Sequence, residues 1–398
     1  MKKLAILVLT LAVSMGFLIG PVAASEPGEL LIWADDNRIE VLQEFEDEFE
    51  EELGVPVILR EKSFDAINDD LGVEAPAGEG PDVFVGAHDW MGELVADGLV
   101  EPIEMDQELV DQFEDVGIEA FTWGEEHYGL PYAMESIALI YNKDLVEEPP
   151  ASFDEFAEVV RDISAEDDKY GFALPQPDPY HTYPFMTALG GYVFGYDEEG
   201  VLNPHDIGLN NEGAIAGLER LNELYAEESV PYVDFDTMEG LFTTGDLAMM
   251  VTGPWVFPAL DDADVDYGVA QIPLMNDNPP QPFVGVQGFM ISSFTENPIL
   301  SLTFVTELLA DEEIMHRFYE IEPRPPAHIA AAERAAGDPN TEGILESAAD
   351  GTPMPAIPEM SAVWGAWEDA LDLIFTQEQD VRPAMDDAVE LIRQEIEN

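Results

Sequence analysis

Aromatic and polar side chains stand together at several points where predicted strands or helices begin and end. Flat aromatic rings stack on the C–H faces of sugars, and carboxylate, amide and guanidinium groups bridge adjacent sugar hydroxyls. A single tryptophan is more often a core residue than a ligand contact, so composition alone indicates such a binding site only weakly. The segments that combine these residue types are Trp33 with Asp35–Arg38, His88–Trp90, Asp178–Tyr180, Thr252–Trp255, and Trp364 with Trp367.

Other kinds of chemistry find little support in the composition. The chain has no cysteine, which excludes disulfides and thiolate chemistry. Its six histidines are scattered without paired ligand spacing, so we expect no metal site and no cofactor. Phosphate contacts need clustered Lys and Arg, but 14 basic residues face 85 acidic ones, so nucleic acid is not an expected partner.

The charge is extreme for a folded protein. The formal net charge is -71, and taking away the two lysines of the expected leader leaves -73 on the rest of the chain. Self-repulsion at this density destabilises a compact state, but at ~1 M salt the Debye length falls to ~3 Å and screens most of it. Hydrophobic residues make up 46% of the chain and are interspersed with the acids, so a core can form. We interpret the charge as adaptation to a very saline exterior.

The first 24 residues have the pattern of a signal peptide. Lys2 and Lys3 precede an apolar run over Leu4–Ile19, and the small residues Val22–Ala24 form a cleavage site. The alternative, a permanent membrane anchor, is less favoured because the run is short for a span. No cysteine stands at the processing site, so we expect a periplasmic protein without a lipid anchor.

Predicted strands and helices alternate in the first part of the mature chain. Apolar strands are expected at Leu30–Trp33, Val55–Leu59 and Pro81–Val85, with helices over Ile39–Leu53 and over 65–73. This βαβαβ order indicates a mostly parallel sheet covered by helices, which binds ligands beyond the carboxyl ends of its strands.

A second series of elements follows, and the length argues for two lobes because single cores stop growing beyond ~250–300 residues. Ser152 and Glu155 form a capping box ahead of a helix. Strands are expected at Tyr170–Leu174, Leu247–Val251 and Tyr267–Ile272. Helices are expected at Asn211–Glu227, Leu300–Leu309, Glu312–Tyr319, Ser361–Phe375 and Arg382–Glu397.

Residue order adds a more specific signal. The chain resembles the maltose/maltodextrin-binding proteins of bacterial ABC importers along essentially its whole mature length. The runs that carry this resemblance are Leu31–Trp33, Gly80–Phe84, Ala87–Asp89, Phe121–Trp123, Ala138–Leu145, Gly190–Tyr192, Thr252–Trp255, Pro282–Val286 and Met354–Trp364.

The resemblance implies a two-lobe α/β clamp of the periplasmic-binding-protein type, with several crossings between the lobes. The first lobe would comprise residues 25–133 and 288–338, and the second residues 134–287 and 339–398. It also implies that a monomer captures maltose or maltodextrin in the cleft without catalysis. Closure would then present the protein to the membrane subunits of an ABC permease.

Carried over residue by residue, the resemblance gives a set of expected ligand contacts. Asp89 and Glu135 match carboxylates that bind sugar hydroxyls, and Asp178 stands where the family usually has a glutamate. Asn37 and Arg38 stand where an Asp-Lys pair is common. The expected stacking rings are Tyr180, Trp255 and Trp364.

Four positions depart from the family pattern. Gly86 replaces a stacking tryptophan, Gly365 a tyrosine, and Trp90 and Glu368 two arginines. Trp90 and Trp367 are candidates to restore aromatic area from neighbouring positions. With these departures we still expect a carbohydrate ligand, but the resemblance does not determine which sugar binds.

Two other functions stay open. The ligand could be another oligosaccharide or an osmolyte, such as trehalose or a galacto-oligosaccharide. The less favoured alternative is a secreted glycoside hydrolase with Glu135 and Asp178 as its acid/base pair, although paired acids carry little information in so acidic a chain.

Overall fold

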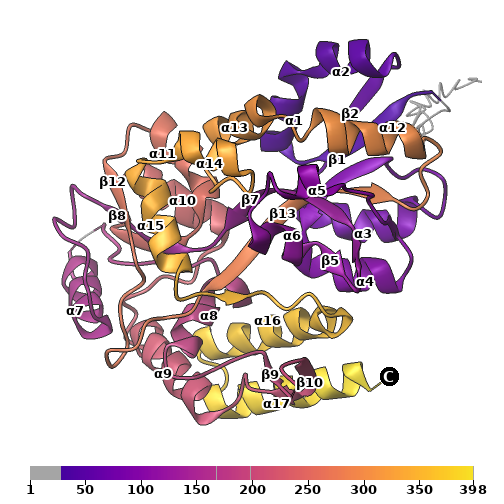
Figure 1. Cartoon of the computed structure of the whole chain (residues 1–398). Helices are drawn as coiled ribbons and strands as arrows, with labels where there is room; N and C mark the ends of the chain where they lie inside the picture. The colour runs from indigo at the N-terminus through magenta and orange to yellow at the C-terminus, as the bar shows by residue number, and fades with distance from the viewer. Residues whose placement is uncertain (1–27, 167, 198, 398) are drawn as a thin grey trace, which may run out of the picture.

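Two α/β bodies lie side by side and share two strands that pass between them (Figure 1). The computed structural model describes residues 28–166, 168–197 and 199–397, so the predicted leader, residues 1–24, lies outside the described residues. We call the body around strands β1–β3 the first lobe and the body around β8, β11 and β12 the second lobe. This two-lobe α/β architecture confirms the predicted fold class.

A seven-stranded mixed sheet forms the centre of the first lobe. Its strands are β1 (Leu30–Ala34), β2 (Val57–Glu61), β3 (Val83–Ala87), β4 (Val100–Glu101), β7 (Gly129–Glu135), β13 (Phe283–Ser292) and β14 (Thr352–Pro353). Strand β1 lies between β2 and β3 in parallel pairing. All residues of β1 and β3 are buried, as expected for parallel strands covered on both faces. The three strands predicted from the sequence are confirmed within two residues.

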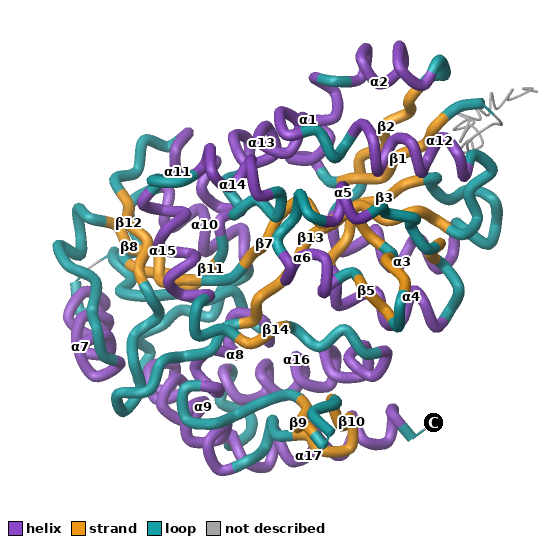
Figure 2. The backbone as a smooth tube through the Cα atoms, in the orientation of Figure 1, coloured by secondary structure: helices purple, strands orange, loops and turns teal. Residues whose placement is uncertain are grey.

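Strands β7 and β13 connect the lobes. They pair antiparallel, with a register shift between Gln287 and Gly288. At one end of β13, Phe283 packs into the core of the second lobe, and towards the other end Phe289 packs into the core of the first. Figure 2 shows both strands running between the helices of the two lobes. Side chains at the middle of these strands therefore lie between the lobes.

The second lobe has a smaller, antiparallel sheet. Strand β8 (Ala138–Asn142) lies between β11 (Met249–Thr252) and β12 (Tyr267–Ala270). A hairpin of β9 (Phe194–Tyr196) and β10 (Leu202–Ile207) lies apart from it, as do β5 (Thr122–Trp123) and β6 (Glu126–His127) in the first lobe. The parallel arrangement expected from the βαβαβ order is present in β1–β3, and β4 and β7 run in the same direction as these strands. Strand β13 and its parallel neighbour β14 run against them, and the sheet of the second lobe is antiparallel.

Helices cover both sheets. In the first lobe they are α1 (Asp36–Glu44), α2 (Glu46–Leu53), α3 (Phe64–Glu74), η1 (His88–Trp90), α4 (Met91–Ala96), α5 (Gln107–Val110), α6 (Asp115–Ala120), α12 (Pro298–Thr303), the π-helix η3 (Phe304–Leu308), α13 (Glu312–Ile321) and α14 (Ile329–Ala335). The remaining helices are α7 (Phe153–Ser164), α8 (Pro179–Thr187), α9 (Glu212–Ala226), α10 (Phe235–Thr243), η2 (Pro254–Val256), α11 (Phe257–Asp262), α15 (Pro339–Ala348), η4 (Pro358–Met360), α16 (Ser361–Phe375) and α17 (Val381–Ile396). No helix in the described ranges is long and apolar enough to cross a membrane.

One predicted strand is wrong. Residues 170–174 form only isolated bridges to Leu247 and Met250 beside β11. The backbone N–H of Gly171 donates to the Ser164 hydroxyl at 2.9 Å, so it is not available to a ladder. The predicted capping box is confirmed, since Ser152 and Glu155 bond each other's backbone at the start of α7.

Candidate functional site

The end of β1 brings Asn37 and Arg38 to the start of α1. Asp35 caps this helix by accepting a hydrogen bond from the Arg38 backbone N–H, 3.3 Å away. The Arg38 side chain is buried and pairs with Asp35 (Nη2–Oδ2 3.0 Å) and with Glu322. Asn37 stays partly exposed. The guanidinium of Arg38 is therefore engaged by protein carboxylates, and only Asn37 of this predicted pair is open to solvent.

Arg324 and Glu322 continue this line of charges, and sequence reasoning missed both. They lie in the proline-rich turn after α13. The Arg324 guanidinium donates to Glu322 (Nη2–Oε1 2.8 Å) and to Glu135, and its Cζ lies 5.4 Å from the centre of the Trp255 ring. The available signal was an arginine between prolines in a chain with only 14 basic residues.

Glu135 stands at the end of β7, where the chain passes from one lobe to the other. It is 8% exposed, and both of its carboxylate oxygens accept hydrogen bonds from the protein. Gln287 of β13 donates to Oε1 at 2.9 Å, and Arg324 donates to Oε2. These two donors fix the orientation of the carboxylate predicted to bind sugar hydroxyls.

Asp89 and Trp90 lie in η1, directly after β3, and meet Trp364 of α16. The three residues line a cavity of about 400 Å³, to which η4 also contributes. Burial, with a smaller contribution from the nearby charge of Glu135, raises the pKa of the Asp89 carboxyl to about 7. This cavity thus combines three of the predicted site residues from elements far apart in the sequence.

The Trp90 ring lies over Gly86. A Cβ atom at Gly86 would come within 2.7 Å of the Cε3 and Cζ3 atoms of Trp90. Phe64 packs against Trp90, with ring centroids 4.9 Å apart. Trp90 therefore occupies the space that a side chain at position 86 would need, which supports the expectation that aromatic area lost at 86 returns from 90.

Tyr180 and Trp255 form an aromatic face on the second lobe, with ring centroids 6.2 Å apart. Asp178 begins α8 by accepting from the His181 backbone N–H at 3.1 Å, and its other oxygen lies 2.9 Å from the His181 ring. Trp255 lies in η2 after β11, and its ring lies over Gly253, where a Cβ atom would collide with it.

Trp364 extends this aromatic face, but Trp367 does not. Phe283 lies between the rings, with centroids 5.9 Å from Tyr180 and 6.0 Å from Trp364. Trp367 is fully buried and stacks parallel to Trp364 at 6.3 Å. A fully buried ring offers no face to a ligand, so the structure corrects the expected role of Trp367 to packing beneath Trp364.

Buried polar atoms without a protein partner gather around Glu135. Among the described residues, such atoms include Asp89 Oδ1, Tyr180 Oη, Gln287 Oε1 and Arg324 Nε. Gln287 and Arg324 bond Glu135 directly, and the charge of Glu135 raises the pKa of both Asp89 and Tyr180, although burial is the larger cause. A ligand rich in hydroxyl groups could satisfy such atoms.

The two acids of the hydrolase alternative, Glu135 and Asp178, are poorly suited to catalysis. Asp178 caps a helix and contacts His181 through both oxygens, and Glu135 is bonded by Gln287 and Arg324. A hydrolase would need a carboxyl group free to exchange a proton with the substrate. Within the described ranges, no group of three or more His, Asp or Glu side chains could hold a metal ion.

Comparison with protein families decides the class of this molecule. The model of the bacterial extracellular solute-binding proteins matches residues 44–342. The chain belongs to this family. Extracellular solute-binding proteins are not enzymes, so the two lobes of this solute-binding protein serve binding and not catalysis.

Named relatives align with most of this solute-binding protein. A galactooligosaccharide-binding protein of Bacillus subtilis is 30% identical, and the alignment covers 99% of this chain and 97% of the relative. A maltotriose-binding protein of Pyrococcus abyssi is 31% identical over 87% of this chain and 78% of its own. A maltodextrin-binding protein of Bacillus subtilis is 29% identical, and the alignment covers 94% of this chain and 92% of the relative.

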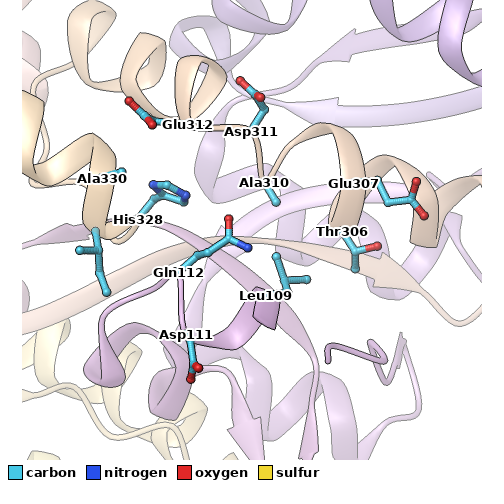
Figure 3. Close-up of a pocket in the computed structure, with 11 residues that line it drawn as sticks. Leu109, Asp111, Gln112, Thr306, Glu307, Ala310, Asp311, Glu312, His328 and Ala330 are labelled. Atoms are coloured by element: carbon cyan, nitrogen blue, oxygen red, sulfur yellow. The ribbon is translucent and has the colours of Figure 1, made fainter. Parts of the chain in front are cut away.

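A second hollow, of about 580 Å³, lies elsewhere on this solute-binding protein, in the first lobe (Figure 3). Leu109, Gln112, Glu307, Glu312 and His328 are among its lining residues. The lining includes none of the predicted site residues and no Phe, Tyr or Trp. It offers no large aromatic face for stacking, so we place the candidate site between the lobes.

Proposed function

We propose that this solute-binding protein captures an oligosaccharide between its lobes and delivers it to the membrane subunits of an ABC permease. The observation that carries the proposal is the group of unpaired buried polar atoms around Glu135, next to the rings of Trp255 and Tyr180. A buried polar atom without a partner costs about 1–3 kcal/mol. Sugar hydroxyls can both donate and accept, and the C–H face of a sugar ring fits an aromatic surface.

The proposal includes the arrangement of the clamp. The first lobe comprises residues 25–133 and 288–338, and the second comprises 134–287 and 339–398. Asn37, Asp89 and Trp90 contact the ligand from the first lobe, and Glu135, Asp178, Tyr180, Trp255 and Trp364 contact it from the second. The protein acts as a monomer in the periplasm, where its leader directs it.

Maltodextrin is the ligand we propose first. The residue runs shared with maltodextrin-binding proteins cover both lobes, and two relatives are named for maltotriose and maltodextrin. A galacto-oligosaccharide is the second candidate. One support is the galactooligosaccharide-binding relative, whose alignment covers 99% of this chain. The other is that Gly86 stands where the maltodextrin-binding family has a tryptophan while the ring of Trp90 lies over it, which changes the aromatic surface of the cleft.

Isothermal titration calorimetry tests the proposal directly. Maltose, maltotriose and a galactotriose are titrated into the mature protein at ~1 M salt or above, where repulsion between the acids is screened. We expect a dissociation constant of about 1 μM or lower, which corresponds to roughly -8 kcal/mol. Heat from the galactotriose alone would select the second candidate, and no heat from any of the three would refute oligosaccharide capture.

A product assay separates binding from hydrolysis. After prolonged incubation with maltotriose, chromatography should recover the sugar intact. Release of glucose or maltose would favour the hydrolase instead.

A further inference from the structure

A line of buried charges runs from the first lobe to the aromatic face of the second lobe. It alternates in sign through Asp35, Arg38, Glu322, Arg324 and Glu135, and every member is at most 8% exposed. Burying charges costs free energy even when they are paired, because each must leave water. The chain has only 14 basic residues and 85 acidic ones, and two of the basic residues, Arg38 and Arg324, lie in this line. The burial of two scarce cations at this place calls for a functional reason.

Arg324 is the member that reaches the aromatic face. Its guanidinium bonds Glu322 through Nη2 and Glu135 through Nη1, while its Cζ lies 5.4 Å from the centre of the Trp255 ring. A planar guanidinium can bond two carboxylates at its edge and still present a flat face to an aromatic ring. A lysine ammonium is a compact charge and cannot do both.

The other end of the line is fixed in the first lobe. Glu322 also accepts from Arg38, which pairs with Asp35 at the start of α1. The turn that carries Arg324 is itself bonded to β7, since the Met134 N–H donates to Pro325 O at 2.8 Å. Arg324 therefore stands on the first lobe and the connecting strand while touching a residue of the second lobe.

We propose that Arg324 is a positioning residue that sets ligand affinity by fixing the Glu135 carboxylate and the Trp255 ring relative to the first lobe. This inference rests on the proposed function, in which Glu135 and Trp255 contact the oligosaccharide. Because the pairs are buried, salt screens them far less than exposed pairs, so this positioning operates equally at low and high salinity.

Three variants test the proposal, with maltotriose as the calorimetric probe. Arg324→Met removes the guanidinium and keeps much of its length, and Arg324→Lys keeps the charge without the plane. Arg317→Met is the matched control, because Arg317 pairs with Glu44 at 2.7 Å and with Glu320 at 3.1 Å on the surface of α13. We expect about a 10-fold weaker affinity for Arg324→Met at both ~0.1 M and ~1 M salt, and no change for the control.

Arg324→Lys distinguishes positioning from charge compensation. We expect it to restore the thermal midpoint, because the ammonium still neutralises Glu135 and Glu322, but not the affinity. If Arg324→Met does not fold, the lysine variant still decides the question. Parent-like affinity in either folded variant would overturn the proposal.

A ligand-free measurement separates this inference from the identity of the sugar. Urea unfolding of Arg324→Met, Trp255→Ala and the double variant gives the coupling between the two side chains. We expect Arg324→Met to lower the folding equilibrium constant in the parent and in Trp255→Ala. The factor should be about threefold smaller in Trp255→Ala, where the contact with the ring is already lost. If maltotriose gave no heat with the parent protein, only that ligand would be refuted. If the changes in unfolding free energy of the two single variants added up to that of the double variant, the contact between Arg324 and Trp255 would be overturned.

Discussion

Two glycines determine where two tryptophans of the cleft can lie. The ring of Trp90 covers Gly86, and the ring of Trp255 covers Gly253, so neither position has room for a methyl group. Substitution of these glycines should therefore act on the neighbouring ring and not on the glycine's own surroundings.

Gly253→Ala should weaken oligosaccharide binding about as much as Trp255→Ala does. The new Cβ would displace the Trp255 ring from the face that it shares with Tyr180, and losing a stacked ring costs about 1 kcal/mol or more, which is at least roughly 5-fold in affinity. Calorimetry measures the affinity, and circular dichroism shows whether the fold is kept. Gly240→Ala in α10 is the matched control, because nothing lies within 4 Å of its Cβ. Full affinity in Gly253→Ala would mean that the ring takes no part in binding.

Asp89 should make stability fall as the pH rises from about 4 to about 7. Burial and then the charge of Glu135 raise its pKa from 3.8 to about 7, so the folded state binds the proton more tightly than the unfolded state. Its stabilising contribution is complete below about pH 4 and is lost as the pH rises through about 7. Urea unfolding of Asp89→Asn across this range should show a smaller decline than the parent.

The exposed Asp262 at the end of α11 supplies the control for this measurement. Asp262→Asn should keep the parent's pH dependence. If Asp89→Asn and the parent had the same slope, Asp89 would not be protonated at neutral pH.

Sequence patterns named most residues of the candidate site but not the residues that orient them. Trp255 and Trp364 could be predicted because each lies in a run shared with a known family. Arg324 could not, since its contact with Glu135 joins residues 189 positions apart. Trp367 was misjudged because spacing on a helix gives the direction of a side chain and not its depth.

At the scale of elements, His88 joins three segments. Its Nδ1 accepts from the Val286 N–H of β13 at 3.1 Å, and its Nε2 therefore carries the proton and donates to Met354 O at 3.2 Å. Burial lowers the pKa of His88 to about 4, so the ring stays neutral near pH 7. This side chain fixes η1, with Asp89 and Trp90, against the strand that connects the lobes.

His88→Phe should destabilise the protein by about 1–3 kcal/mol at pH 7. The phenyl ring would fill the volume but leave a buried N–H and a buried carbonyl without partners. Urea unfolding measures the loss, and His205→Phe on the exposed strand β10 is the control. A loss of less than about 0.5 kcal/mol would mean that both backbone groups find other partners.

Elements whose signals are local could be predicted well. The capping box at Ser152 and the helix over Ser361–Phe375 depend on neighbouring residues, and both are confirmed. The segment 170–174 has the apolar composition of a strand, but a hydrogen bond to Ser164 interrupts its ladder. Tertiary contacts of this kind leave no trace in local composition.

At the scale of the whole molecule, thermal stability should rise with salt. The formal charge of -71 is spread over the chain, and its repulsion weakens as the Debye length falls from ~10 Å at 0.1 M to ~3 Å at ~1 M. Differential scanning calorimetry in NaCl measures the midpoint. A midpoint that stayed flat or fell over this range would contradict screening as the source of stability.

Ligand binding should bring the lobes together. Strands β7 and β13 are interrupted by the register shift at Gln287 and Gly288, where a disrupted ladder can absorb a rotation. A ligand that touches both lobes binds the closed state better and shifts the equilibrium towards it. Small-angle scattering should show a smaller radius of gyration with saturating maltotriose than without sugar. An unchanged radius would contradict closure on binding.

The buried line from Asp35 to Glu135 affects how the protein would perform as a sugar sensor in brines of different strength. Dilution would unfold part of the population, because the surface charges repel one another. The molecules that stay folded would keep their site, since ions in solution do not reach the pairs that orient it. Because sugar binds only the folded molecules and draws the others back to the folded state, the apparent dissociation constant would rise as the folded fraction falls, while the intrinsic affinity of the site would stay the same.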